Sequence, residues 1–210
     1  MSAVDFASLL CSRLCHDLVG PVGALYNGVE LLADEDDPEM RQRCVELVAE
    51  SAQHTAAKLK FFRLAFGAAG GFAAEVDTSE AKAALEGLYA GDKRMELGWM
   101  VGPPAPPKGA VRILLVLAMT AGDALVRGGR LSVGAERYPA GLDLAVRAEG
   151  PRIIMDDELR AALEGRTAMD AVTPRAAPAF LVRSLVDEAG GKLRVSTTDD
   201  ALVFGVTLAA

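Results

Sequence analysis

The stretch from Phe6 to Leu32 carries apolar residues at a spacing of three or four, which is typical of one buried side of a long α-helix. A second helical pattern follows directly, because Asp37 can cap a helix whose first turn holds Pro38, and the apolar spacing then continues to Phe66. The apolar positions of the first helix are Phe6, Leu10, Leu14, Leu18, Val22, Leu25, Val29 and Leu32. We therefore predict a hairpin of two long helices over residues 5–67.

Two such helices are too few to bury both of their apolar stripes. At a rise of about 1.5 Å per residue each helix is on the order of 40 Å long, and each stripe needs a partner surface of similar length. A second copy of the chain would supply the other two helices of a symmetric four-helix bundle. We expect a homodimer, with residues 1–70 as its helical dimerisation domain.

After the glycine-rich segment at residues 67–71, the pattern changes to alternating helices and strands. The predicted elements are a half-buried strand at 95–101, a mostly buried helix at 110–129 closed by its two final glycines, two strands joined by a turn within 130–149, a helix ending near Gly190, and two strands around the turn at Asp199 and Asp200. We predict an α+β protein, in which the helical hairpin is followed by a two-layer α/β sandwich over residues 71–210.

The acidic composition argues against nucleic acid as a partner. The formal net charge is −7 and the pI is about 4.9, whereas proteins that bind the phosphate backbone concentrate positive charge. The hydrophobic fraction of 51% suffices for a buried core, and the longest apolar run, at 113–122, is too short to cross a bilayer. The start of the chain has no basic leader. We expect a soluble cytoplasmic protein with no membrane partner.

The three cysteines indicate neither disulfides nor a metal site. Cys11, Cys15 and Cys44 are an odd number and form no C-x-x-C pair. Cys11 and Cys15 lie one helical turn apart, but unpaired thiols on a packed helix are far more often core residues than metal ligands. We predict reduced, buried thiols and no metal site.

His16 occupies the polar side of the first helix. Residues two apart in a helix are turned by about 200°, so His16 points away from Leu14 and Leu18 and toward solvent. The face around it carries polar or small residues that would let a large partner approach closely, namely Ser12, Arg13, Gly20, Gly23 and Asn27. We predict that Ser12, Gly20, Gly23 and Asn27 form a docking surface around the imidazole.

The neighbours of His16 suit nucleophilic chemistry. A carboxylate such as Asp17 can hold one ring N–H, act as an acid or base, and direct the other ring nitrogen at an electrophile. Arg13 can supply positive charge toward transferred phosphoryl oxygens. Pro21 removes the backbone donor to Asp17 and should bend the helix just past His16. The candidate catalytic residues are His16, Asp17 and Arg13, with no residue assigned to a cofactor or a metal.

The segment HDLVGP resembles the phospho-accepting H-box of two-component histidine kinases, where an acidic residue follows the histidine and a proline lies five positions on. The longer segment CHDLVGPVGALYNGVELL, the helix end FFRLAFGA and the α/β pattern behind them are similar to the ChpT-type histidine phosphotransferases of alphaproteobacterial phosphorelays. The resemblance covers nearly the whole chain. It implies that His16 is phosphorylated, that Asp17 is its acid/base neighbour, and that receiver domains of a hybrid kinase and of response regulators are the partners.

The α/β part resembles the ATP-binding domain of histidine kinases, whose nucleotide site has three signatures. These are two asparagines four apart on a helix, an Asp-x-Gly-x-Gly turn and a Gly-x-Gly loop. The residues at the corresponding positions here are Met119 and Asp123, then Ala148 and Arg152, then Ala177, Pro178 and Ala179. Methionine does not bind Mg²⁺, the base-reading carboxylate is missing, and proline removes a backbone donor from the phosphate loop. We predict a degenerate domain without nucleotide binding.

The expected function is therefore a histidine phosphotransferase that shuttles phosphoryl groups between receiver aspartates. No cofactor of its own is expected, because the Mg²⁺ that neutralises the phosphoryl oxygens would come with the receiver. Two alternatives stay open: an active histidine kinase with an unusual ATP site, and a dimeric scaffold that docks response regulators without transfer. His54, the other histidine, has no adjacent acid and is interpreted as a bundle-surface residue.

Overall fold

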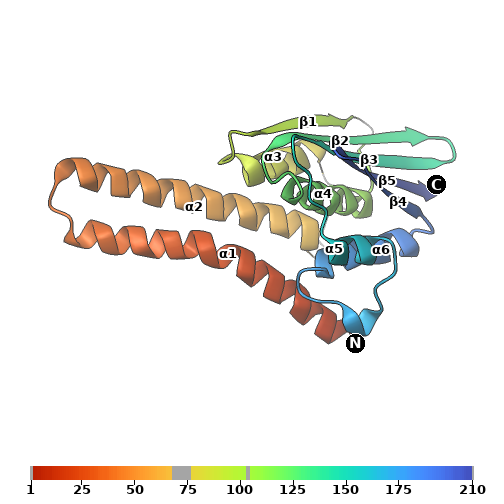
Figure 1. Ribbon diagram of the computed structural model, residues 1–210, viewed down its shortest axis with the longest axis horizontal. Helices are drawn as coiled ribbons and strands as arrows, with labels where there is room; N and C mark the ends of the chain where they lie inside the picture. Colours follow the sequence, from red (N-terminus) through yellow and green to blue (C-terminus); the bar gives the residue numbers. More distant parts are fainter. Residues whose placement is uncertain (1, 68–76, 103–104, 210) are drawn as a thin grey trace.

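The computed structural model describes residues 2–67, 77–102 and 105–209. The chain begins with two antiparallel helices, α1 (Ala3–Asp34) and α2 (Pro38–Phe66), which project from the rest of the molecule as a hairpin (Figure 1). The side chain of Asp37 accepts a hydrogen bond from the backbone N–H of Met40, so the predicted cap of α2 is confirmed. The predicted domain boundary near residue 70 lies outside the described residues.

The second part of the chain is built on one mixed sheet of five strands, in the order β1-β2-β3-β5-β4. The strands are β1 (Met95–Val101), β2 (Gly129–Tyr138), β3 (Gly141–Glu149), β4 (Lys192–Thr197) and β5 (Ala201–Ala209). β1 runs parallel to β2, and the other neighbours are antiparallel. The predicted hairpins at Pro139 and at the pair Asp199 and Asp200 are confirmed, as is the α+β class.

Within the described part of the chain, four helices and one short 3-10 turn accompany the sheet. They are α3 (Thr78–Tyr89), α4 (Lys108–Asp123), α5 (Asp157–Leu163), the turn Met169–Ala171, and α6 (Ala177–Glu188). The sequence pattern had not indicated α3 or α5. The predicted end of α4 at the glycine pair was wrong, because the helix stops at Asp123, Gly128 lies in the connection that follows, and Gly129 begins β2. Gly128 and Gly129 adopt φ of 77° and 146°, where a Cβ would collide with the backbone of Arg94 and Glu149.

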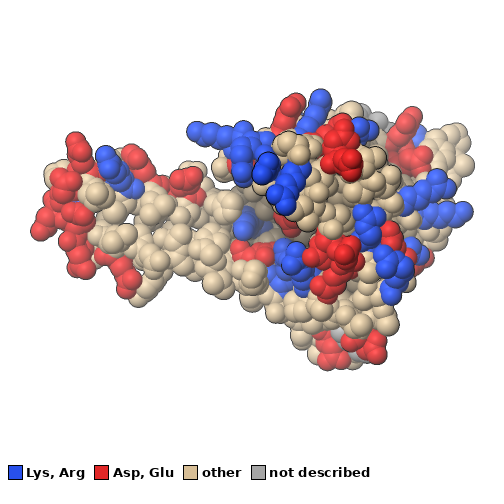
Figure 2. All heavy atoms as spheres, in the orientation of Figure 1, with Lys and Arg blue, Asp and Glu red and all other residues tan. Residues whose placement is uncertain are grey.

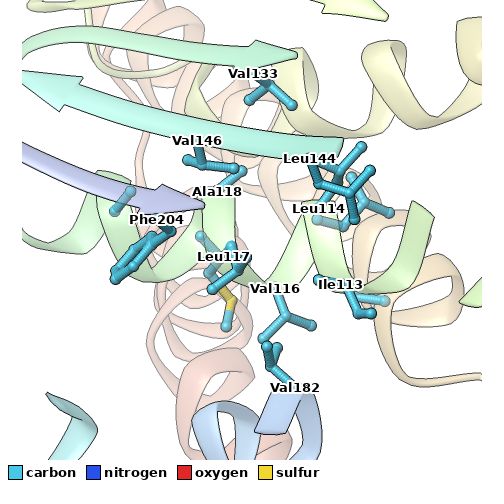
Figure 3. Close-up of a cluster of buried hydrophobic side chains, with 14 of the residues drawn as sticks. Ile113, Leu114, Val116, Leu117, Ala118, Val133, Leu144, Val146, Val182 and Phe204 are labelled. Carbon is cyan, nitrogen blue, oxygen red and sulfur yellow. The ribbon is translucent and has the colours of Figure 1, made fainter. Parts of the chain in front are cut away.

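The core is centred on α4, which is buried almost continuously from Ala110 to Gly122. In Figure 3, Leu117 and Ala118 of α4 lie under the strand residues Val146 and Phe204, while Val116 faces Val182 of α6. The last turns of α2 join this same core through three residues, Phe61, Phe62 and Ala65. The base of the hairpin is therefore packed into the α/β part.

The start of α1 is also anchored to the α/β part. The ring of Phe6 packs on Phe180 of α6, with 5.6 Å between the ring centroids. The guanidinium of Arg112 on α4 donates a hydrogen bond to the backbone carbonyl of Ala65 at 3.3 Å. These contacts fix the first half of α1 and the end of α2 against the domain that follows.

The predicted burial of two cysteines was wrong. Cys11 and Cys15 are exposed, and Cys44 is buried. The residues of α1 that contact the core include Leu10, Leu14 and Leu18, and a step of about 100° per residue turns Cys11 and Cys15 away from that line.

Within the described residues, no helix combines the length and apolar character that crossing a membrane requires.

Candidate functional site

His16 projects from the middle of α1 into solvent, as the helical pattern predicts. Its side chain is 85% exposed. The ring nitrogen Nδ1 lies 3.3 Å from Oδ1 of Asp17. When the proton occupies Nδ1, that carboxylate oxygen accepts a hydrogen bond from it, and the lone pair on Nε2 is free to attack an electrophile.

Asp17 is held from its other side. Its Oδ2 accepts a hydrogen bond from Nε of Arg13 at 2.8 Å, and only 16% of the Asp17 side chain is exposed. Each oxygen of this carboxylate therefore has a partner of its own, one of which is the histidine ring. The structure brings the three predicted catalytic residues into one hydrogen-bonded group.

The backbone beside His16 is tied to α2. Pro21 lies inside α1, and the helix bends partway along its length (Figure 1). Because proline has no backbone N–H, Pro21 cannot donate a hydrogen bond to the carbonyl of Asp17 one turn earlier. Nζ of Lys58 on α2 donates a hydrogen bond to this carbonyl at 3.0 Å. Lys58 cannot be recognised as part of the site from the sequence, because no local pattern connects a lysine on the second helix with a proline on the first.

Asp123, at the end of α4, faces the same group from the α/β part. Its Oδ2 lies 3.7 Å from Nη2 of Arg13. The side chain of Asp123 is 53% exposed. Desolvation of its carboxyl group raises the pKa of Asp123 to about 6. The charge of Arg13 opposes this rise, and the charge of Asp17 adds to it.

Tyr89 on α3 lies next to Asp123. Its hydroxyl donates to the backbone carbonyls of Ala118 and Met119. Burial, and secondarily the charge of Asp123, raise the pKa of Tyr89.

A cleft of about 630 Å³ opens beside His16, between α1 and the α/β part. Its wall across from the histidine is formed by the segment before α5 and the loop before α6. There Arg175 forms an ion pair with Asp156 at 3.0 Å. The lining residues are Ser12, Arg13, His16, Thr120, Asp123, Ala124, Ile154, Met155, Asp156, Glu158, Leu159, Thr173, Pro174 and Arg175.

The four predicted docking residues lie around His16 along α1. Ser12, Gly20 and Asn27 are exposed, and Gly23 is half-buried. A Cβ built on Gly20 or Gly23 would meet nothing within 4 Å. Packing inside the chain therefore does not require glycine at either position, in contrast to Gly28, where a Cβ would lie 2.6 Å from Cγ2 of Val48.

The positions at which the sequence resemblance would place nucleotide-binding residues are mostly apolar. Ala148, Ala177 and Ala179 have no exposed surface, and Met119 is 6% exposed. The run from Ala177 to Ala179 forms the first turn of α6, and Pro178 stands within that turn. Arg152 lies exposed at the surface. Among the described residues, no three His, Cys, Asp or Glu side chains are grouped to hold a metal ion.

His54, interpreted from the sequence as a bundle-surface residue, is half-buried. It lines two cavities between the hairpin and α3, one of which it shares with Lys58. Burial, with the charge of Lys58 as the second cause, lowers the pKa of His54. The packing of α3 against α2, which the sequence pattern did not indicate, covers this side of the hairpin.

The middle of the hairpin exposes several apolar side chains. Figure 2 shows charged residues gathered at the tip of the hairpin and over the α/β part, with a largely uncharged surface between them. Val22, Tyr26 and Val29 of α1 are 48%, 64% and 58% exposed, and Leu47 of α2 is 45% exposed. Exposed apolar residues at helical spacing are typical of a surface that another molecule covers.

A helical hairpin that presents an exposed histidine, joined to a helix-covered mixed sheet, is the arrangement that the sequence resemblance to histidine phosphotransferases implies. Residues 78–201 match the family model described as the histidine phosphotransferase C-terminal domain. The chain is 31% identical over 208 residues to protein phosphotransferase ChpT of Brucella abortus (strain 2308), a match that covers 97% of this chain and 96% of that protein. The chain belongs to the histidine phosphotransferase family.

A solved structure described as a bacterial phosphotransferase is similar over the whole length. It superposes with a TM-score of 0.85 at 29% identity, covering 98% of this chain and 97% of that one. The hairpin and the α/β part therefore both have counterparts in a phosphotransferase structure. The chain is a phosphotransferase of the phosphorelay type, as the sequence resemblance implied.

Proposed function

We propose that this chain carries phosphoryl groups between the receiver-domain aspartates of a two-component phosphorelay, through a phosphohistidine at His16. The observation that carries the proposal is the geometry of the imidazole. Its Nδ1 faces Asp17 at 3.3 Å, while the side chain as a whole is 85% exposed beside a large cleft. A second protein can therefore reach Nε2.

The chemical step follows from this arrangement. The lone pair of Nε2 attacks the phosphorus of a receiver's phospho-aspartate in line, the bond from phosphorus to the carboxylate oxygen breaks, and the carboxylate leaves with the electron pair. The ring then carries a proton on Nδ1 and a phosphoryl group on Nε2, and it is positively charged. The carboxylate of Asp17 stabilises this charge, and a second receiver's aspartate attacks the phosphohistidine in the reverse sense.

Positive charge near the phosphoryl group is assigned to Arg13 and to the partner. The Arg13 guanidinium lies one turn before His16 and lines the same cleft, from which it can attract phosphoryl oxygens. The Mg²⁺ that neutralises most of the phosphoryl charge would be bound by the receiver. The residues at the vestigial nucleotide positions, with alanine and proline in the first turn of α6, support a phosphoryl source other than ATP.

Dimerisation through the hairpin is part of the proposal. The exposed side chains of Val22, Tyr26 and Val29 need an apolar partner, and a second copy of the hairpin has a matching surface. A four-helix bundle would form, and Ser12, Gly20, Gly23 and Asn27 would be docking residues for the receiver. The cytoplasm is the compartment that the reduced thiols favour.

The test is a phosphotransfer assay with the full chain against a panel of phosphorylated receiver domains and ATP-charged kinases. Label on the wild-type chain, none on His16→Gln and full label on His54→Gln would support the proposal. Label on His16 from ATP alone would indicate a histidine kinase instead. Receiver binding without any transfer would indicate the scaffold function and would contradict the proposal.

A further inference from the structure

At the site, four charged or titratable side chains from α1 and α4 form a continuous chain of contacts in space. Oδ2 of Asp123 lies 3.7 Å from Nη2 of Arg13, and Nε of Arg13 donates to Oδ2 of Asp17 at 2.8 Å. Oδ1 of Asp17 in turn lies 3.3 Å from Nδ1 of His16. Asp123, Arg13 and Asp17 line a cavity of about 250 Å³ between the hairpin, α3 and α4, and His16 is the exposed ring.

Arg13 needs a second anchor to hold Asp17 in one orientation. A single ion pair between residues four apart on a helix contributes little, because a long side chain loses much rotational freedom in forming it. Asp123 supplies an anchor from outside α1. It follows the buried run from Ala110 to Gly122 on α4, so its backbone is fixed by the core of the α/β part.

Charged groups from several elements face Asp123. The charged groups that face it are Arg13 and Asp17 from α1, Lys58 from α2 and Arg175 from the loop before α6, with Tyr89 from α3 nearby. Desolvation raises the pKa of Asp123 to about 6, and this rise outweighs the opposing charges of its cationic neighbours. A carboxylate at a position that disfavours its charge is typical of functional sites.

We infer that Asp123 is a positioning residue for phosphoryl transfer, which through Arg13 holds the Asp17 carboxylate and thereby the His16 ring in the reactive orientation. This inference rests on the proposed phosphoacceptor role of His16. Asp123 does not contact the phosphoryl group. The α/β part thus acts on the reaction through a residue at the helix position where a kinase would bind Mg²⁺.

The test uses phosphoramidate, a small phosphoryl donor, so that receiver docking plays no part. Nε2 attacks its phosphorus, the P–N bond breaks, and the nitrogen leaves as ammonia. For Asp123→Asn we expect His16 to be phosphorylated on the order of tenfold more slowly, comparable to the loss of a residue that orients a metal-binding histidine. The rate is followed by ³¹P NMR on the full chain.

Two further measurements separate positioning from a general structural role. In ¹⁵N NMR spectra of the imidazole, the fraction of His16 with its proton on Nδ1 should fall in Asp123→Asn. If Asp123 acts only through Arg13, the double variant Arg13→Gln/Asp123→Asn should react no more slowly than Arg13→Gln alone. Glu96→Gln is the matched control. Glu96 of β1 pairs with Arg130 of β2 at 3.8 Å and lines neither the cleft beside His16 nor the cavity beside Asp17, so this substitution should leave the rate unchanged.

The fold of the variant is checked by circular dichroism, and Asp123→Ser serves as a second variant should Asp123→Asn fail to fold. Wild-type rates and an unchanged ring tautomer in the folded variant would overturn the inference while leaving the proposed function intact. If wild-type His16 accepts phosphoryl groups neither from phosphoramidate nor from any receiver, the proposed function falls and this inference falls with it.

Discussion

The ammonium group of Lys58 donates a hydrogen bond to the backbone carbonyl oxygen of Asp17, 3.0 Å away. In an uninterrupted helix this carbonyl would accept from the N–H four residues on, which Pro21 lacks. A side chain of α2 therefore replaces the bond that the proline removes from α1. The bend of α1 and the packing of the hairpin are coupled at the residue next to His16.

Lys58→Met should lower the free energy of unfolding by about 1–3 kcal/mol, because it leaves a partly buried carbonyl without a donor while keeping the aliphatic stem. Urea denaturation measures the change. In a Pro21→Ala background the N–H at position 21 can again donate to the Asp17 carbonyl, so Lys58→Met should lower the free energy of unfolding by less. Lys82→Met is the control, since its exposed pair with Glu86 at 3.6 Å should contribute about 0.5 kcal/mol or less. If Lys58→Met lowered the free energy of unfolding equally in both backgrounds, Lys58 would not replace the hydrogen bond that Pro21 removes.

Asp17→Asn should slow transfer by ~100-fold to 10,000-fold, the range of an orienting or acid/base carboxylate. Both oxygens of Asp17 have partners, Arg13 and His16, and an amide must turn an NH₂ group toward one of them. Single-turnover transfer from a phosphorylated receiver gives the rate, and titration with the unphosphorylated receiver should show nearly unchanged affinity. Asp92→Asn, which removes a carboxylate paired with Arg94, is the control. If Asp17→Asn transferred at the wild-type rate, Asp17 would be only a surface charge of the helix without a role in transfer.

The double variant Val22→Glu/Tyr26→Glu should be a monomer, because two charges on the exposed apolar stripe of α1 cannot be buried against a second copy. Sedimentation velocity at micromolar concentration measures this, and circular dichroism should show an unchanged helical content. Val126→Glu is the control, since Val126 is also exposed but lies outside the hairpin. Sedimentation of the wild-type chain as a monomer would rule out the dimer.

Asp123→Asn should raise the melting temperature relative to wild type at pH 7.5 and have little effect at pH 4. The folded-state pKa of Asp123 is raised to about 6, so its contribution to stability is fully present below the ordinary pKa near 3.8 and is lost as the pH rises through about 6. Asparagine does not titrate. Scanning calorimetry of both proteins across this window gives the difference, and a difference that stays constant with pH would contradict the raised pKa.

The sequence determined the local features of the site. Helical spacing placed His16 on the solvent side of α1, because side-chain direction along a regular helix follows from residue number alone. The cap at Asp37, the strand hairpins and the α+β class were likewise predicted from local or periodic patterns in the sequence. The adjacency of His16 and Asp17 and the one-turn spacing of Arg13 were sufficient to predict that these three side chains belong together.

Only the tertiary structure decided which residues from other elements complete the site. Lys58 lies 41 positions after Asp17, and Asp123 comes from α4, so packing alone brings them to α1. The exposure of Cys11 and Cys15 and the partial burial of His54 were likewise decided by packing, since the sequence does not reveal which side of a helix the α/β part covers. Local periodicity specifies the faces of a helix, whereas the burial of apolar surface between distant segments selects the face that each neighbour contacts.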